Sequence, residues 1–218
     1  MLGPARIRVA GTADLEVIVI VGYGRGNIRS VENALERVGC RFRTAGNPRE
    51  IASADKLVLP GVGAFGECMD LLRAKGFEAA ILDHVARGKP LLGICVGMQM
   101  LAETGHEFGT HRGLGLVRGK VVQIPRKDNS LRLPQVGWNE LRPRKDCPLL
   151  RDLPGDRTAY FVHSYHLAAD EAADISADVE YGGPVTAAVS VPPVYGMQFH
   201  PEKSQEVGLR ILSNFAAL

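Results

Sequence analysis

The sequence has few of the residues that mark metal-binding, disulfide-bonded, nucleic-acid-binding or membrane-spanning proteins. Its four cysteines are scattered and form no Cys-x-x-Cys pair, which argues against a zinc site and a disulfide framework. The formal net charge is only +2, so there is no electrostatic case for binding nucleic acid or a membrane surface. No apolar run is long enough to span a bilayer. We therefore expect a protein of the reducing cytoplasm with no structural metal.

The length and composition are those of one globular α/β domain. The chain has 218 residues, of which 45% are hydrophobic and 23% are charged. Residues 1–15 show neither a secretory apolar segment nor the features of a transit peptide, and they have no periodic apolar face. We expect them to form a partly disordered N-terminal extension. Residues 16–218 are expected to form a single domain.

Apolar runs alternate with helical patterns in the first half of the chain. Residues 16–21 and 56–59 read as buried strands, and residues 27–38 and 79–86 read as helices. This alternation predicts a doubly wound, mostly parallel sheet flanked by helices. Beyond about residue 114 the pattern becomes strand-rich. Strands are expected at 116–124, 133–141, 158–162, 185–191 and 194–199, and a closing helix at 207–215.

Cys95 stands where an apolar strand meets a helical pattern, with Gly93 and Gly97 two residues away on either side. Flanking glycines permit the sharp backbone that raises a nucleophile out of a sheet. The N-terminus of a helix stabilises a thiolate, which is the reactive form of cysteine. A buried structural cysteine fits this stretch equally well.

A second polar pair follows the strand expected at residues 194–199. Pro201 fixes the backbone between His200 and Glu202. A cysteine nucleophile needs a base, and the base needs a group that orients it. Taken alone, His-Pro-Glu is an ordinary polar loop. Together with Cys95, the order Cys, His, Glu favours nucleophilic catalysis with His200 as base and Glu202 as its orienting group.

Residues 93–99 and 198–204 together resemble the class I, or triad, glutamine amidotransferases. The further blocks 23–31, 59–66, 137–139 and 160–165 narrow the resemblance to members that serve a cyclase of histidine biosynthesis. The resemblance covers about residues 16–217 and implies a flavodoxin-like fold. It implies hydrolysis of L-glutamine to glutamate and ammonia at Cys95, His200 and Glu202, with no cofactor.

The resemblance also assigns roles around this triad. It implies oxyanion donors among Val62, Gly63 and Val96, and a glutamine pocket formed by Gly61, Gln99, Ser164 and Tyr165. It implies a heterodimer with a (β/α)₈ cyclase that makes imidazole glycerol phosphate and an aminoimidazole carboxamide ribotide. The residues it places at that interface are Asn27, Trp138, Asn139 and Lys203.

Three alternatives remain open on the residues alone. The chain could serve another synthase, of the anthranilate or GMP type. The glycine-rich loop after Gly22 could make it a non-catalytic dinucleotide-binding regulator, but Asn27 occupies the third glycine position of that motif. In the family that the chain resembles, most members have an aspartate where this chain has Gly22, so the resemblance assigns no carboxylate role at this position. His163 and His166 could suggest a metal, but on one strand their side chains would point to opposite faces.

Overall fold

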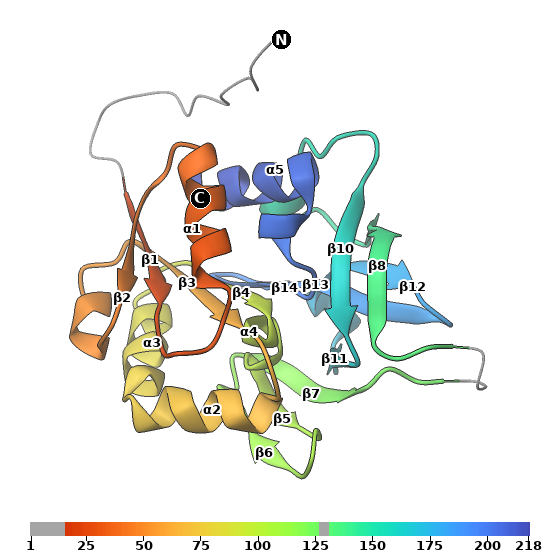
Figure 1. The fold of residues 1–218 in the computed structure, drawn as a ribbon, viewed down its shortest axis with the longest axis horizontal. Coiled ribbons are helices and arrows are strands. Elements are labelled where there is room, and N and C mark those ends of the chain that lie inside the picture. Colours follow the sequence, from red (N-terminus) through yellow and green to blue (C-terminus); the bar gives the residue numbers. More distant parts are fainter. Residues whose placement is uncertain (1–15, 127–130) are drawn as a thin grey trace.

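The computed structural model describes residues 16–126 and 131–218, so the expectation for residues 1–15 lies outside the described residues. Its centre is an eight-stranded sheet in the order β2-β1-β3-β4-β14-β13-β12-β9 (Figure 1). The strands are β1 (Val17–Val21), β2 (Arg41–Ala45), β3 (Lys56–Gly61), β4 (Leu91–Cys95), β9 (Arg142–Pro143), β12 (Ile175–Glu180), β13 (Pro184–Val191) and β14 (Val194–Met197).

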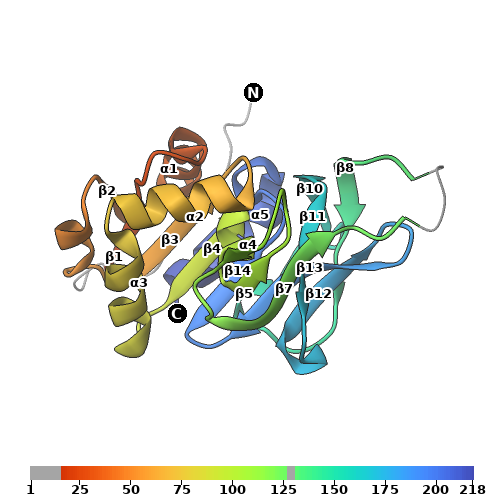
Figure 2. The same cartoon turned by 90° about the horizontal axis from the view of Figure 1, so that it is seen from below.

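The first four strands and β14 run parallel, whereas β13, β12 and β9 continue the sheet in antiparallel pairing. Helices cover both faces of the parallel part (Figures 1 and 2). On one face lie α1 (Ile28–Arg37) and α5 (Gln205–Ala216), and on the other α2 (Phe65–Ala74) and α3 (Phe77–Ala86). The expected doubly wound fold is confirmed.

The continuous apolar runs form the centre of the sheet because both of their faces are covered. Every residue of β3, β4 and β14 is buried. The strands β3, β4 and β14 run parallel and end at the same edge of the sheet. Residues that follow the ends of these strands therefore lie close together, and this positions the site. None of the helices in the described part of the chain is long and apolar enough to cross a membrane.

Two smaller sheets lie beside the main one. The first pairs β8 (Gln135–Glu140) with β10 (Thr158–His163) in antiparallel register. The second has the order β11-β7-β5-β6, formed by Tyr165–Ala169, Val117–Gln123, Ala102–Gly105 and His111–Arg112. The strand-rich second half was expected, but β5, β6, β9, β11 and β12 were not. The strand expected at 158–162 extends to His163, and the separate strand β11 begins at Tyr165.

Candidate active site

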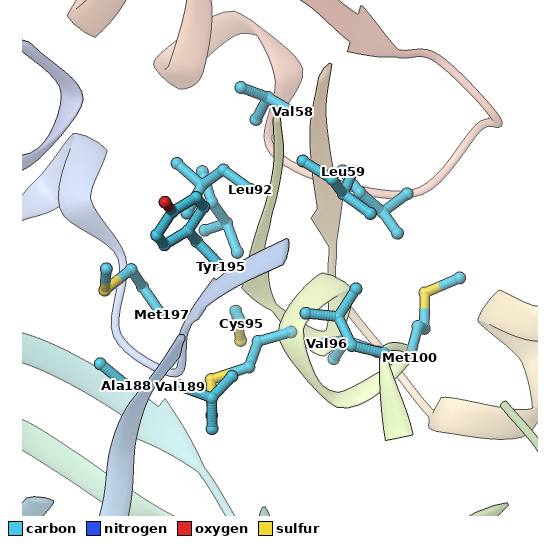
Figure 3. Close-up of a cluster of buried hydrophobic side chains, with 14 of the residues drawn as sticks. Val58, Leu59, Leu92, Cys95, Val96, Met100, Ala188, Val189, Tyr195 and Met197 are labelled. Atoms are coloured by element: carbon cyan, nitrogen blue, oxygen red, sulfur yellow. The ribbon is translucent and has the colours of Figure 1, made fainter. Parts of the chain in front are cut away.

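Cys95 is the last residue of β4, and the single-turn helix α4 (Val96–Gln99) follows it directly. Its backbone has φ +55° and ψ −115°, a conformation that a residue with a side chain rarely adopts. Such strain costs about 1–3 kcal/mol and persists only where the surrounding structure enforces it, often at active sites. Figure 3 shows Cys95 below Leu92 and Tyr195, with Met197 on one side and Val96 on the other.

The flanking glycines act by leaving space rather than by adopting unusual dihedral angles. Neither Gly93 nor Gly97 has a positive φ, so the sharp turn is made by Cys95 itself. A Cβ on Gly97 would lie 1.8 Å from the carbonyl oxygen of Leu59, and one on Gly93 would lie 2.6 Å from that of Gly97. The glycines therefore let α4 lie directly against β3 and β4. The sequence analysis was right that the glycines flank a sharp turn at Cys95. It was wrong that their dihedral freedom makes the turn, because they are needed for close packing.

His200 and Glu202 lie together in the interior, immediately beyond β14. Nδ1 of His200 lies 2.7 Å from Oε1 of Glu202, and the two side chains are only 4% and 1% exposed. Because the carboxylate accepts a hydrogen bond, it holds Nδ1 protonated and leaves Nε2 for the thiol. Cys95 and His200 line the same cavity, and the Cys95 side chain is near enough to help raise the pKa of His200. The structure thus brings the three expected residues side by side in the order Cys95, His200, Glu202.

The electrostatics of this line favour a charged imidazole. Burial opposes the cation, but hydrogen bonds to Cys95 and Glu202 and the negative charges of both groups outweigh it. Together they raise the pKa of His200 to about 10. His200 is therefore protonated at neutral pH beside the sulfur of Cys95.

A cavity of about 240 Å³ opens beside Cys95. Sites for drug-sized ligands are roughly 300–1,000 Å³, so this one fits a smaller molecule such as a single amino acid. Most of the residues expected from the sequence line it, namely Val62, Gly63, Cys95, Val96, Gln99, Ser164, Tyr165 and His200. Gly61 and Glu202 do not line the cavity. Gly61 packs behind it against α4, where a Cβ would lie 2.6 Å from the Gly97 nitrogen.

Gln99 is buried rather than exposed on its helix. Only 3% of it is accessible, and its side-chain amide donates to the Tyr165 carbonyl at 2.8 Å and to Oε1 of Gln198 at 3.1 Å. Gln198 in turn lies with Nε2 4.0 Å from Sγ of Cys95. These contacts tie α4 to the strand that carries Tyr165. Gln198 precedes the His-Pro-Glu motif and was not singled out by the sequence analysis.

Three further residues line the cavity that the sequence analysis did not assign to it: Glu107, Val162 and His163. Glu107 is the one carboxylate among the described residues that line it, and its Oε2 accepts the Phe65 backbone N–H at 2.8 Å. It lies in a polar loop with no motif, so no local signal could have found it.

His163 is a neutral, buried residue of the cavity wall. Burial lowers its pKa to about 4, and its Nδ1–H donates to the Tyr165 carbonyl at 2.9 Å. Across the described residues no three His, Cys, Asp or Glu side chains cluster as metal ligands would. The expectation that His163 and His166 lie on one continuous strand was wrong, because β10 ends at His163 and β11 begins at Tyr165.

The residues expected at a partner interface lie on the β8–β10 pair and nearby. Trp138 is 47% exposed and stacks edge-on against Tyr160 at 5.8 Å between centroids, so it is not a core residue. Nζ of Lys203 lies 5.8 Å from the Tyr160 ring. Asn139 accepts a hydrogen bond from Gln135, and Asn27 stands at the start of α1 with no side-chain capping bond.

Two exposed valines extend this surface. Val136 is 59% and Val162 is 36% exposed, and the two residues pair directly across the strands, as Trp138 and Tyr160 do. We call Val136, Trp138, Tyr160 and Val162 the apolar face. Exposed apolar patches of this kind mark interaction surfaces.

Comparison with known proteins identifies the family. A family model described as glutamine amidotransferase class-I matches residues 19–217. The chain is 47% identical to the imidazole glycerol phosphate synthase subunit HisH of Syntrophotalea carbinolica, over 91% of this chain and 98% of that one. It is 47% identical to the HisH subunit of Salinibacter ruber, covering 91% and 93%, and 43% identical to that of Wolinella succinogenes, covering 93% and 100%.

Solved structures agree on the fold. A putative GMP synthase subunit from Thermoplasma acidophilum superposes with a TM-score of 0.70 at 23% identity, over 94% of both chains. The PurLQS structure from Thermotoga maritima gives 0.72 at 18% identity, over 92% of this chain and 97% of that chain. Sequence, site and fold therefore agree that this chain belongs to the class I glutamine amidotransferases and, among them, to the family of HisH subunits of imidazole glycerol phosphate synthase.

Proposed function

We propose that this chain hydrolyses L-glutamine to glutamate and ammonia at Cys95, and that the ammonia is used by a separate cyclase subunit in histidine biosynthesis. The observation that carries the proposal is the buried line of Cys95, His200 and Glu202 beside a cavity of amino-acid size. The family of this chain supports the same reaction and the same synthase, rather than an anthranilate or GMP type.

In this reaction the Cys95 thiolate attacks the side-chain amide of glutamine. His200 gives its proton to the departing ammonia and then, as a neutral base, activates a water that hydrolyses the glutamyl thioester. The raised pKa of His200 supports the first of these steps, because the imidazole is already protonated when the amide arrives. Glu202 orients His200 and stabilises its cationic form.

The oxyanion of the tetrahedral intermediate would be held by backbone amides. Val62, Gly63 and Val96 all line the cavity beside Cys95, so their backbone amides are the donors we assign to it. In related acyl-transfer chemistry, loss of one such donor costs about 10²–10³ in rate. Two other lining residues, Ser164 and Tyr165, would hold the amino-acid end of the substrate.

Glu107 supplies a carboxylate to the wall of this cavity. Glutamine carries a cationic α-ammonium group, and a carboxylate in a cavity with limited solvent is a strong partner for it. Gln99, held by Tyr165 and Gln198, forms another part of the cavity wall. The pocket thus has a negative end for the ammonium group and a thiolate for the amide.

We further propose that the cyclase, a (β/α)₈ protein, forms a heterodimer with this chain in the cytoplasm. The apolar face and Lys203 would meet it, since Lys203 follows Glu202 directly and joins the triad to that face. No cofactor is needed for glutamine hydrolysis by this site. Trp138→Ala should weaken binding of the cyclase in a titration while leaving the melting temperature unchanged.

The decisive test is glutamine turnover by the chain assayed with its cyclase. Cys95→Ala should abolish release of glutamate, and His200→Ala should be almost as severe. Cys40→Ala is the matched control, because Cys40 is only half-buried and lies outside the cavity. Substantial turnover by Cys95→Ala would overturn the proposal. Binding of a nicotinamide dinucleotide without any ammonia release would favour the regulator instead.

A further inference from the structure

Cys68 is a buried thiol that contacts the loop beside the cavity without lining the cavity itself. It lies in the first half of α2, its side chain is fully buried, and its Sγ donates a hydrogen bond to the Val62 carbonyl at 3.4 Å. The donor is the thiol, because a carbonyl can only accept. Since Cys68 is absent from the cavity wall, the Val62 carbonyl is directed away from the cavity and into the protein.

The direction of this carbonyl fixes the orientation of a whole peptide unit. In a trans peptide the C=O and N–H groups point in opposite directions, so holding the Val62 carbonyl inward turns the Gly63 N–H the other way. Within residues 16–126 and 131–218, this N–H has no hydrogen-bond acceptor. Rotation of this peptide changes ψ of Val62 and φ of Gly63. Because Gly63 has no side chain and already has φ +100°, it offers little steric resistance to that rotation.

A rotated peptide would place a carbonyl dipole where the Proposed function needs an N–H donor. The negative end of that dipole would repel the oxyanion of the tetrahedral intermediate. The Cys68 thiol opposes this rotation because it bonds the carbonyl only in the inward orientation.

Tyr23 packs beside the sulfur of Cys68. The Tyr23 side chain is fully buried, and its hydroxyl donates to Sδ of Met100 at 3.7 Å. The thiol is therefore placed by its position on α2 and by packing of the segments that follow β1 and α4. Its position is set by the fold rather than by the loop that it holds.

We propose that Cys68 is a positioning residue of the glutaminase, which keeps the Val62 carbonyl out of the cavity and the amides of the Val62–Gly63 loop available to the oxyanion. This inference rests on the proposed function, because it concerns the same site. It assigns a role to a cysteine that neither binds substrate nor takes part in the covalent steps.

The test compares variants of Cys68 in the chain assayed with its cyclase. Cys68→Val fills the site with a slightly larger apolar side chain that has no donor, Cys68→Ala removes both volume and donor, and Cys68→Ser keeps a donor with a shorter reach. Cys147→Val is the matched control, because Cys147 is also buried but lies outside the cavity. A net hydrogen bond is worth a factor of about two to ten, so kcat should fall by about that factor in the valine and alanine variants. KM for glutamine should stay unchanged, and serine should recover part of kcat.

Alkylation of Cys95 by iodoacetamide, followed by peptide mass mapping, separates positioning from general damage. This reaction needs the thiolate but no oxyanion donor, so its rate should be the same in Cys68→Val and in the unmodified chain. The inference is overturned if kcat of either folded donor-free variant equals that of the unmodified chain. It is also overturned if KM and the alkylation rate change together with kcat. If Cys68→Val does not fold, Cys68→Ala decides.

Failure of the proposed function gives a different result from failure of this inference. In the first case the unmodified chain with its cyclase would release no glutamate from glutamine. In the second case the unmodified chain would be active and the Cys68 variants would match it.

Discussion

Replacing Glu202 with glutamine should lower the pKa of His200 without unfolding the site. The Glu202 carboxylate lies 2.7 Å from Nδ1 of His200 and is almost completely buried. Glutamine keeps the size and an acceptor oxygen for the Nδ1–H, but it has no charge. An opposite charge at such a distance moves a pKa by about one to three pH units toward the charged form. The pKa of His200, about 10 in the unmodified chain, should therefore fall by about that amount.

The sign of the effect on stability follows from the direction of the change. A histidine whose pKa is raised in the folded state stabilises the fold most fully below its unfolded pKa, about 6.5. That contribution declines as the pH rises and is lost when the pH passes the folded pKa, about 10. Each pH unit removed by Glu202→Gln corresponds to about 1.4 kcal/mol of this contribution. The variant should therefore differ most from the unmodified chain at neutral pH and below, and differ little above pH 10.

The measurement is an NMR titration of the imidazole Cε1–H groups of the six histidines. The His200 signal is the one absent from His200→Ala. His163 is the internal control, because burial keeps its pKa near 4 and its signal should not titrate between neutral and alkaline pH. If His200 of the unmodified chain titrates at or below 6.5, the reasoning is refuted. If it titrates near 10 in both proteins, the Glu202 charge is not the cause.

Three other outcomes are expected. Gly63→Pro should strongly reduce the rise in glutamine turnover that the cyclase and its nucleotide substrate produce, because proline removes an N–H and cannot adopt φ +100°; an undiminished rise would show that Gly63 is only a turn residue. Gly22→Asp should lower the melting temperature, because a Cβ there would lie 2.6 Å from the Ala45 carbonyl oxygen; an unchanged value would mean that β2 moves aside freely. Removal of residues 1–13 should leave turnover with the cyclase unchanged, and insoluble protein would contradict this.

The parallel core could be predicted from the sequence because its signal is local. The strands β1, β3 and β4 are continuous apolar runs, and burial on both faces is what makes such runs stable. The expected bounds differ from the observed ones by a few residues at most for β1 and α1.

The strand β12 could not be predicted because its stability depends on residues far away in the chain. It carries Asp178, which is 4% exposed and would count against a buried strand. Arg142 and Arg144 pair with its two carboxylate oxygens at 2.9 and 2.8 Å. Such compensation across more than thirty residues leaves no local pattern.

Some residues of the site also have a local sequence signal, whereas others depend on contacts between distant segments. Cys95, His200 and Glu202 stand in short motifs at strand ends, so the sequence places them together through the topology of the sheet. Glu107 and Cys68 reach the site only because loops and helices from other segments pack there. No spacing in the sequence encodes either contact.

The structure also changes the physical account of the reactive thiolate. The sequence argument gave the helix after Cys95 the role of stabilising it, but α4 is only four residues long. A single turn offers free N–H groups and little aligned dipole, so it can bind an oxyanion more readily than it can supply a full compensating charge. That charge comes from His200, which is buried beside the sulfur and kept protonated by Glu202. The N-terminus of α4 is therefore suited to binding the oxyanion, whereas His200, which follows β14, supplies the positive charge beside the sulfur of Cys95.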